Sequence, residues 1–429
     1  MLRVNSIAVV VAAFATGGAV AADIEIFPGD SFRDAVQGLN PGDTLIVHEG
    51  TYAHTNRISI TVQGSATDPV VITGAEGEAR PVIQLIQSGH NTMEISGATY
   101  LTIRGLEITA PGMPGADGIN MNGGPAHITL EDNVIHDIAV GINFRSSMHH
   151  IVARRNEIYD TRGTGEGFYI GCHSGSCSVT DSIIEQNYIH HTLNSDQGDG
   201  IEIKLNSHSN IVRDNVIHDT HYPCILLYGT GGGDRNVVER NVMWNCGDSG
   251  IQVAADTVFR NNLILASTDN GITSQSHNGV SPNNLEFVHN TIVGGSTCLR
   301  FQGWGNKTGM VFANNAVYCA GSSYSIGSLD GVVITGNVFE AAPPSSIPAS
   351  GYAVGRSKAQ DFVNPDNRNV YPSLDSPLIG GGDGAHAVAD DFNGSGRSGA
   401  IDVGAYDWVG AANPGWQVTE DFKDAPVRP

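Results

Sequence analysis

Four residues in the middle of the chain supply an amine, two phenols and a guanidinium. The 429-residue sequence has only four lysines, and Lys204 is the only one on the repeated strand face of its middle section. Tyr169 and Arg145 lie one and two repeats before it, and Tyr228 lies one repeat after it. Such a set can exchange protons with a substrate and hold a carboxylate, which is the chemistry of proton removal next to a carboxylate.

The reaction that suits this set is β-elimination on a uronate polymer. Arg145, with the amides of Asn120 and Asn143, would neutralise the C6 carboxylate and stabilise the enolate that develops beside it. Lys204 or Tyr169 would remove the C5 proton, and the other would protonate the departing glycosidic oxygen. We therefore predict Lys204, Tyr169 and Arg145 as the catalytic residues.

Further substrate contacts are predicted for Asn120 and Asn143 and for four flanking residues: His173, Glu202, His221 and Tyr228. Tyr228 is the alternative proton donor to Tyr169, and an ion pair with Glu202 is the alternative role of Lys204. Hydrolysis of a glycosidic bond requires two carboxyl groups across the bond, and Glu202 is the only one on the predicted central face. Elimination is therefore favoured over hydrolysis.

A repeat of about 25 residues predicts the scaffold that positions these side chains. Between residues 96 and 341 an apolar strand is followed by Asn, then any residue, then an apolar one, with the asparagines 21 to 31 residues apart. A period in the twenties without helical periodicity is typical of stacked β-coils. The repeated asparagines are Asn133, Asn156, Asn187, Asn215, Asn241, Asn262, Asn290, Asn315 and Asn337.

Spacing within the repeat predicts a corner at each Asn. The flanking apolar residues are five positions apart, so both can face inward only if the chain turns between them. Asn tolerates left-handed geometry, and stacked copies could form an amide ladder. A second strand follows each corner and alternates strictly, which places Tyr169, Lys204 and Tyr228 on one outward, exposed face. Stacking at about 4.8 Å puts the Cα atoms of Tyr169 and Lys204 roughly 8 Å apart.

The predicted fold is an all-β, right-handed parallel β-helix with an N-terminal cap and an irregular C-terminal cap. Residues 1–22 read as a signal peptide, which predicts a secreted or periplasmic protein. Residues 23–95 would form the N-terminal cap, with a short helix over residues 31–36, and the first coils. Residues 96–341 would form the central β-helix with the catalytic groove, and residues 342–429 the C-terminal cap.

The net charge of the chain limits the kinds of partner that it can bind. The 44 acidic and 22 basic residues give a net charge of −22, which argues against a nucleic-acid partner. No later segment is apolar enough to span a membrane, and a monomer is expected. Binding of an anionic polysaccharide would then require a locally positive patch around Arg145 and Lys204.

The six cysteines are expected to pair outside the cytoplasm, and no metal site is predicted. Two pairs are separated by about one repeat and could join neighbouring coils, and the third could close a local loop. A zinc site is disfavoured because no Cys-x-x-Cys occurs. Residues 390–394 (DDFNG) could bind calcium, although a solvated turn is the preferred interpretation. The expected disulfides are Cys172–Cys177, Cys224–Cys246 and Cys298–Cys319.

The central coils resemble the parallel β-helix alginate lyases, especially polysaccharide lyase family 31. The resemblance is carried by residues 165–171 (GEGFYIG), 198–204 (GDGIEIK) and 209–215 (SNIVRDN). The catalytic pair of that family is a Tyr and a Lys on successive coils. The resemblance thus implies Tyr169 as the acid and Lys204 as the base, in an enzyme that cleaves alginate.

A more distant resemblance links the same segment to family 6, which includes alginate lyase and chondroitinase B. Family 6 pairs its Lys with an Arg one coil later, whereas this chain has Leu227, Tyr228 and Gly229 there. The calcium site of the family has no identifiable counterpart. Two alternatives stay open: another uronate-active β-helix enzyme (a pectate or glycosaminoglycan lyase, or a C5-epimerase), and a polysaccharide-binding or adhesion solenoid without activity.

Overall fold

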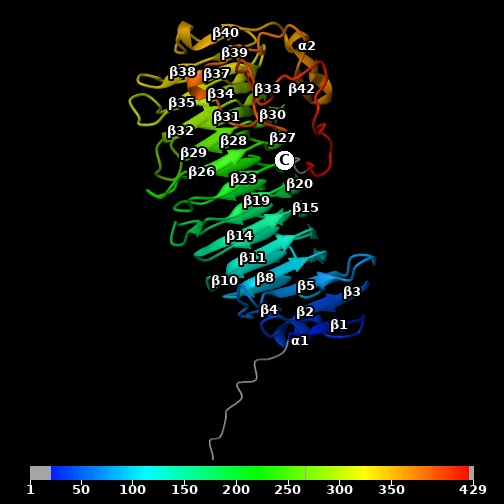
Figure 1. The fold of residues 1–429 in the computed structure, drawn as a ribbon. Coiled ribbons are helices and arrows are strands. Elements are labelled where there is room, and N and C mark those ends of the chain that lie inside the picture. Colours follow the sequence, from blue (N-terminus) through cyan, green and yellow to red (C-terminus); the bar gives the residue numbers. More distant parts are fainter. Residues whose placement is uncertain (1–20, 266, 425–429) are drawn as a thin grey trace, which may run out of the picture.

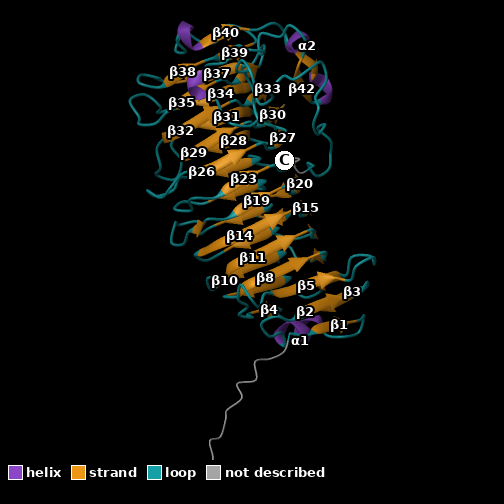
Figure 2. Ribbon diagram, in the orientation of Figure 1, coloured by secondary structure: helices purple, strands orange, loops and turns teal. Residues whose placement is uncertain are grey.

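The computed structural model describes residues 21–265 and 267–424, so the predicted signal peptide lies almost entirely outside the described residues. The chain winds into a right-handed parallel β-helix whose strands stack along one axis (Figures 1 and 2). Each coil contributes one strand to each of three long parallel sheets, called sheets I, II and III here. None of the helices in the described part of the chain has the length and apolarity of a membrane span.

Sheet I carries the predicted catalytic residues and has 11 strands. In spatial order they are β4 (Ser59–Ile60), β7 (Met93–Ser96), β10 (Ile119–Asn122), β13 (Ile142–Phe144), β17 (Phe168–Ile170), β22 (Ile201–Ile203), β25 (Ile225–Leu227), β28 (Ser249–Val253), β31 (Asn270–Ser274), β34 (Thr297–Phe301) and β37 (Ser323–Ile326).

Sheet II follows sheet I in each coil and has 14 strands. They are β1 (Asp23–Ile26), β2 (Thr44–Val47), β5 (Val70–Gly74), β8 (Thr99–Arg104), β11 (Ala126–Glu131), β14 (Met148–Arg154), β19 (Ile183–Glu185), β23 (Ile211–Arg213), β26 (Asn236–Glu239), β29 (Ala255–Arg260), β32 (Asn283–Val288), β35 (Val311–Ala313) and β38 (Val333–Thr335), with β18 (Val179–Thr180) beside β14.

Sheet III completes each coil and has 13 strands. They are β3 (Thr51–His54), β6 (Val82–Leu85), β9 (Glu107–Thr109), β12 (Val134–His136), β15 (Glu157–Tyr159), β20 (Tyr188–Thr192), β24 (Val216–Thr220), β27 (Val242–Cys246), β30 (Leu263–Leu265), β33 (Thr291–Val293), β36 (Ala316–Tyr318), β39 (Asn337–Phe339) and β40 (Tyr352–Val354).

The repeated asparagines stack at the corner between sheets II and III and form the predicted amide ladder. All nine are buried, and each amide nitrogen from Asn133 to Asn315 donates to the side-chain oxygen of the next asparagine at 2.9–3.1 Å. The ladder asparagines are not themselves left-handed, although tolerance of that geometry favours Asn at a corner. The left-handed residue is the one before it, as in Asp214 (φ 57°) and Arg240 (φ 55°), because the Asn amide must point into the coil to bond backbone groups.

We expect Asn215→Ala to lower the free energy of unfolding by at least about 3 kcal/mol. Its amide nitrogen donates to the carbonyl of Ile184 and to Asn241, and its oxygen accepts from Asn187. Each buried group left unpaired costs about 1–3 kcal/mol. Urea denaturation followed by circular dichroism measures the loss. The control Asn56→Ala, at an exposed site, should change the free energy of unfolding by less than about 0.5 kcal/mol. Equal losses in the two variants would contradict the view that the amide ladder stabilises the fold.

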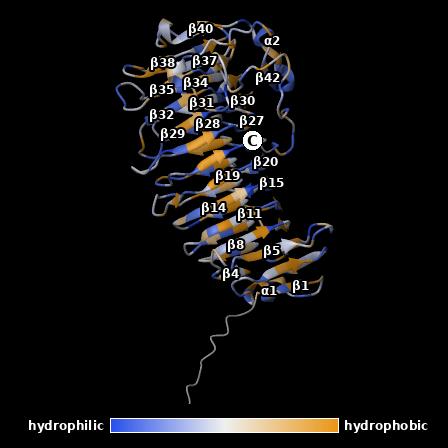
Figure 3. Ribbon diagram, viewed as in Figure 1, coloured by the Kyte–Doolittle hydropathy of each residue, from blue (hydrophilic) through white to orange (hydrophobic). Residues whose placement is uncertain are grey.

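Inward-facing apolar side chains fill the coils, as the alternation predicts. The inward pairs of sheet I, from Ile119 and Met121 to Leu299 and Phe301, are at most 2% exposed. Figure 3 shows hydrophobic residues concentrated in the strands and hydrophilic residues in most loops. Burial of a large apolar side chain contributes about 1.5–3 kcal/mol, so the continuous core is the main source of rod stability.

The two ends of the β-helix are built differently. The predicted N-terminal helix is present as α1 (Phe32–Gln37), capped by Ser31, and lies at the first coil (Figure 1). At the other end, α2 (Lys358–Asp361) and the antiparallel pair β41 (Phe362–Asn364) and β42 (Asn369–Pro372) follow β40.

The chain then returns along the side of the rod. The Lys423 ammonium donates to Asp214 at 2.8 Å and to the carbonyls of Arg240 and Phe392. The contacts to Asp214 and Arg240 hold the last described residues against coils that lie about 200 positions earlier in the chain.

All three predicted disulfides are present. Cys224–Cys246 and Cys298–Cys319 link successive coils at Cα separations of 5.3 and 5.9 Å, and Cys172–Cys177 closes a local loop. Each pairing therefore agrees with the spacing argument.

Candidate active site

The register of sheet I brings the predicted catalytic residues together. Tyr169 in β17 pairs with Asn143 in β13 on one side and with Glu202 in β22 on the other. Lys204 follows β22, and its ammonium lies 4.5 Å from the centre of the Tyr169 ring. The predicted convergence of the amine and the phenol is therefore present.

Lys204 is held between two phenols and a carboxylate. Its ammonium forms an ion pair with Glu202 and lies 3.3 Å from the Tyr228 hydroxyl, which donates to the same Glu202 oxygen at 2.8 Å. Gly171 makes this arrangement possible: a Cβ on it would lie 2.7 Å from the Ser207 hydroxyl and 3.2 Å from the Lys204 Cβ. The small residue thus leaves space for Lys204 beside Tyr169.

The prediction that this face is exposed was wrong for most of its residues. Lys204 is 2% exposed, Glu202 1%, Tyr228 5% and Tyr169 7%. The side chains do point outward from the coil, but they cover one another and are covered by the inserted loops beside them. Arg145, at the end of the cluster, is the exposed member.

Two inserted loops wall the cluster and contribute two further carboxylates. The strands β16 (Arg162–Gly163) and β21 (Asn194–Ser195) pair with each other in the loops that precede β17 and β22, and each loop ends in a Gly-acid-Gly turn. These turns place Glu166 and Asp199 directly before β17 and β22. Oxygens of Glu166, Asp199 and Glu202 lie within 4.8 Å of one another, and all three residues are buried.

Crowding of buried carboxylates shifts their protonation. Burial, with the Glu202 charge nearby, raises the pKa of Glu166 to about 6. Burial and the charges of Glu202 and Glu166 raise the pKa of Asp199 well above its usual value. Burial is also the main reason that the pKa values of Tyr169 and Tyr228 are raised, so both phenols are protonated and able to donate.

The expected positive patch is not formed by Lys204, because Glu202 neutralises its charge and two more carboxylates lie close by. These carboxylates fit a hard divalent cation such as calcium, which prefers oxygen ligands. Both oxygens of Glu166 and one oxygen each of Asp199 and Glu202 are buried without a hydrogen-bond partner in the described structure.

The tail segment at residues 390–394 fits calcium less well, in line with the preferred interpretation as a turn. Asp390 forms an ion pair with Arg240 at 2.6 Å. The Asp391 carboxylate accepts from the backbone amides of Asn393 and Ser395 at 2.9 and 3.0 Å. Both carboxylates therefore already have protein partners in the positions where a calcium ion would bind.

Arg145 and the side-chain amides of Asn120 and Asn143 lie on the two coils that precede the coil of Tyr169. The Arg145 guanidinium is 5.5 Å from the centre of the Tyr169 ring. The amide nitrogens of Asn120 and Asn143 both donate to one oxygen of Asp117, at 2.8 and 2.9 Å. Their donors are thus committed to a buried carboxylate, and Arg145 is the group best placed to meet a substrate carboxylate.

A hollow of 220 Å³ opens beside the cluster. It is lined by Glu202, Tyr228 and Asp199 of the cluster and by the ring of His277, which lies 4.9 Å from the Tyr228 ring. Tyr222, 40% exposed, forms part of its rim. This hollow connects the buried carboxylates Glu202 and Asp199 and the Tyr228 phenol with the surface.

Two predicted contacts lie at the periphery. His173 is exposed in the loop that the Cys172–Cys177 disulfide closes. His221 is exposed, packs against the Tyr222 ring and has its Nδ1 2.8 Å from the Ser195 carbonyl. His221 therefore lies beside the hollow, whereas His173 lies on the disulfide loop.

Sequence reasoning missed three residues of the site, namely Glu166, Asp199 and His277. A signal for the two acids was present, because Gly-acid-Gly occurs at the same place in two successive coils. His277 lies in an irregular loop between β31 and β32 and has no counterpart in other coils. The repeat could not indicate it.

Titration of Glu166 should be visible in the stability of the protein. Because its pKa rises from 4.5 to about 6 on folding, the native state retains a proton that the unfolded state releases. The free energy of unfolding should therefore fall by about 2 kcal/mol as the pH rises from below 4.5 to above 6. Denaturation of wild type and Glu166→Gln with chelator present measures this contribution. Parallel pH profiles of the two proteins would contradict it.

Comparisons with known proteins agree with this architecture. The family model of the right-handed β-helix region matches residues 83–233, and that of the periplasmic copper-binding protein NosD matches residues 182–342. No curated protein has a significant match to the sequence. The chain has the right-handed parallel β-helix fold.

Solved structures with this fold are similar over most of the chain. Pectate lyase Pel9A is 14% identical with a TM-score of 0.55, over 88% of this chain and 90% of that chain. A mannuronic-acid-specific polysaccharide family 6 lyase from human gut microbiota is 17% identical with a TM-score of 0.55, over 78% and 91%. XylC, solved with xylose, is 11% identical with a TM-score of 0.61, over 90% and 98%. At these identities the likeness establishes the fold, and membership of family 31 stays a prediction.

Proposed function

We propose that this protein is a polysaccharide lyase that cleaves alginate by β-elimination outside the cytoplasm. The observation that carries the proposal is the Lys204 amine enclosed by the Tyr169 and Tyr228 rings and paired with Glu202, beside a hollow of 220 Å³. A solenoid that only binds or adheres to a polysaccharide has no need for buried, interacting acid–base groups. The family 6 and pectate lyases among the similar structures support the reaction class.

In the proposed reaction, Arg145 holds the C6 carboxylate and stabilises the enolate. Lys204 in its neutral form takes the C5 proton, and the electron pair of that C–H bond becomes the C4–C5 double bond. The bond from C4 to the glycosidic oxygen breaks, and Tyr169 donates its proton to that oxygen. Proton transfers of this kind contribute on the order of 10²–10⁴ each to the rate.

A calcium ion on Glu166, Asp199 and Glu202 would fit this proposal. It would supply positive charge that attracts a uronate. The cation would also relieve the mutual repulsion of three buried carboxylates. A polyanionic substrate could then approach a protein whose net charge is −22.

Glycoside hydrolysis is the second candidate, because the structure corrects the count of carboxylates. Glu166 and Asp199 join Glu202, where the sequence indicated Glu202 alone. Hydrolysis requires one carboxyl group on each side of the scissile bond, about 5–9.5 Å apart. The three carboxylates instead form one buried group with oxygens within 4.8 Å, which favours elimination.

The products of polymer cleavage distinguish these functions. Incubation with alginate should raise the ultraviolet absorbance, because elimination creates a double bond conjugated to the carboxylate. Polygalacturonate and glycosaminoglycans test the other uronate polymers, and new reducing ends without absorbance would indicate hydrolysis instead. Binding without any product would support the adhesion alternative and overturn the proposed activity.

The proposal places the protein, as a monomer with an anionic polysaccharide as its partner, in the periplasm or outside the cell. Three disulfides and the match to a family model described as periplasmic are consistent with that location.

A further inference from the structure

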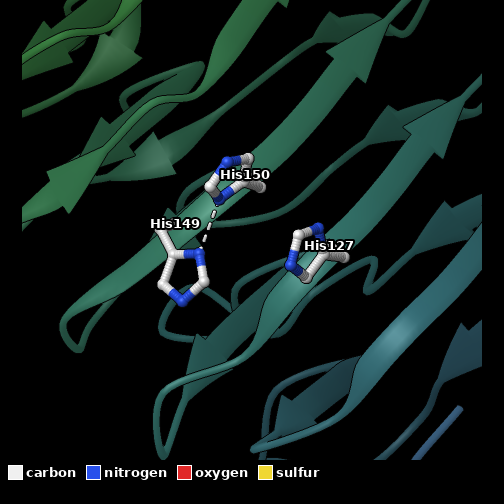
Figure 4. Close-up of side chains that lie close together, drawn as sticks. All are labelled: His127, His149 and His150. Atoms are coloured by element: carbon white, nitrogen blue, oxygen red, sulfur yellow. Dashed lines mark hydrogen bonds between the residues drawn. The ribbon is translucent and has the colours of Figure 1, made fainter. Parts of the chain in front are cut away.

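Three histidines gather on sheet II, away from the carboxylate cluster. His127 lies in β11, and His149 and His150 lie in the neighbouring strand β14 (Figure 4). Their candidate ligand nitrogens all lie within 4.8 Å of one another. His149 and His150 are exposed and His127 is half-buried, so an ion from solvent can reach the group.

The β-helix register holds the three imidazoles together. Ala126 pairs with His149 and Ile128 with Ile151, so His127 and His150 occupy equivalent positions one coil apart. Both have left-handed backbone, with φ of 56°. Their rings stack at 4.7 Å, and the His149 ring lies edge-on to both at 5.6 and 4.9 Å.

The ring nitrogens of this cluster are suited to accept a metal ion. The Nδ1 atoms of His149 and His150 are 2.7 Å apart, so at least one of them must present a lone pair rather than a proton. A metal ion bound between the rings would accept lone pairs from these nitrogens and form coordination bonds to them.

A second histidine group shows what a structural arrangement looks like in this fold. His218 is buried and stacks between the His190 and Trp244 rings. Its Nδ1 lies 2.6 Å from Asp219, and its Nε2 lies 2.9 Å from the Tyr188 hydroxyl. Both nitrogens thus have protein partners, so this group is less suited to a metal although it lies within the NosD-matched residues.

We propose that His127, His149 and His150 form a surface site for a divalent transition-metal ion of the zinc and copper class. Imidazole is a preferred ligand of these ions, and three imidazoles leave an open position for water or another ligand. Bonds of about 2.0–2.1 Å require ligand nitrogens about 3.4 Å apart, which small rotations of the two exposed rings can reach. Asp181 occupies the position equivalent to His150 one coil later.

Calorimetric titration of untagged, metal-free protein with ZnCl₂ tests this proposal, with CuCl₂ as a second probe. One ion should bind per chain, and His127→Gln, His149→Gln and His150→Gln should each weaken the affinity about tenfold or more. Circular dichroism checks that each variant keeps its fold.

Two control variants locate the ion. His386→Gln removes a histidine outside both groups. His191→Gln removes a residue whose ring nitrogen lies near those of His218 and Asp219 in the second group. Both should bind zinc as the wild type does. Absence of binding in the wild type, loss of binding in His191→Gln alone, or unchanged binding in all three cluster variants would each overturn the site.

Discussion

Lys204→Ala is expected to abolish most activity and to destabilise the protein. The rate of formation of unsaturated product should fall by a factor on the order of 10²–10⁴, because the base of the proposed reaction is lost. The free energy of unfolding should fall by about 3–5 kcal/mol, since Glu202 would remain buried without its ionic partner. Sequence reasoning, which took Lys204 as exposed, predicts no such loss of stability.

A double substitution separates the two effects. Lys204→Met with Glu202→Gln removes both charges while it keeps side chains of similar size in the buried space. Most of the lost stability should return, whereas activity should not. Ultraviolet assays on alginate and urea denaturation measure the two quantities on the same samples.

Lys307 offers a matched control, because it is an exposed lysine outside the cluster. Lys307→Ala should leave both activity and stability close to wild type. A Lys204→Ala variant with wild-type activity would exclude Lys204 as the base. A stable but inactive variant would instead show that the buried ion pair contributes little to folding.

The scaffold was predictable because its determinants are local and repeated. Each Asn marks a corner, and the alternation within each strand shows which side chains point inward and which outward. Because each coil repeats this pattern, successive coils stack with corresponding positions in register. Consequently the placement of Tyr169 beside Lys204 followed from counting residues, as did the pairing of Cys224 with Cys246 one coil later.

Burial and charge at the site were not predictable from the repeat. Exposure of an outward side chain depends on the inserts that cover it, and the length of an insert does not reveal its path. Glu166 lies beside Asp199 because the hydrogen bonding of sheet I continues from Gly167 to Asp199, but the pairing of β16 with β21 and the loop that carries His277 have no repeated pattern. The alternation of residues therefore predicted correctly that these side chains point outward from the coil, but it predicted their exposure to solvent wrongly.

Replacement of the two tyrosines by Phe should have different effects: Tyr169→Phe should mainly lower activity, and Tyr228→Phe should mainly lower stability. Tyr169→Phe keeps the ring that lies 4.5 Å from the Lys204 ammonium but removes the proposed proton donor, so the rate should fall on the order of 10²–10⁴ with little change in stability. Tyr228→Phe removes a hydrogen bond of 2.8 Å to the buried Glu202 carboxylate, which should lower the free energy of unfolding by about 1.5–3 kcal/mol.

The Tyr228 hydroxyl already donates to Glu202, so we expect it to position the ion pair rather than to donate a proton to a substrate. The rate of Tyr228→Phe should accordingly fall by no more than about tenfold, which corresponds to about 1.4 kcal/mol. Rates at saturating alginate, together with denaturation midpoints, decide between the two phenols. If Tyr169→Phe retains its rate, Tyr169 is not the proton donor, and an inactive Tyr228→Phe variant that keeps its denaturation midpoint would point to Tyr228 instead.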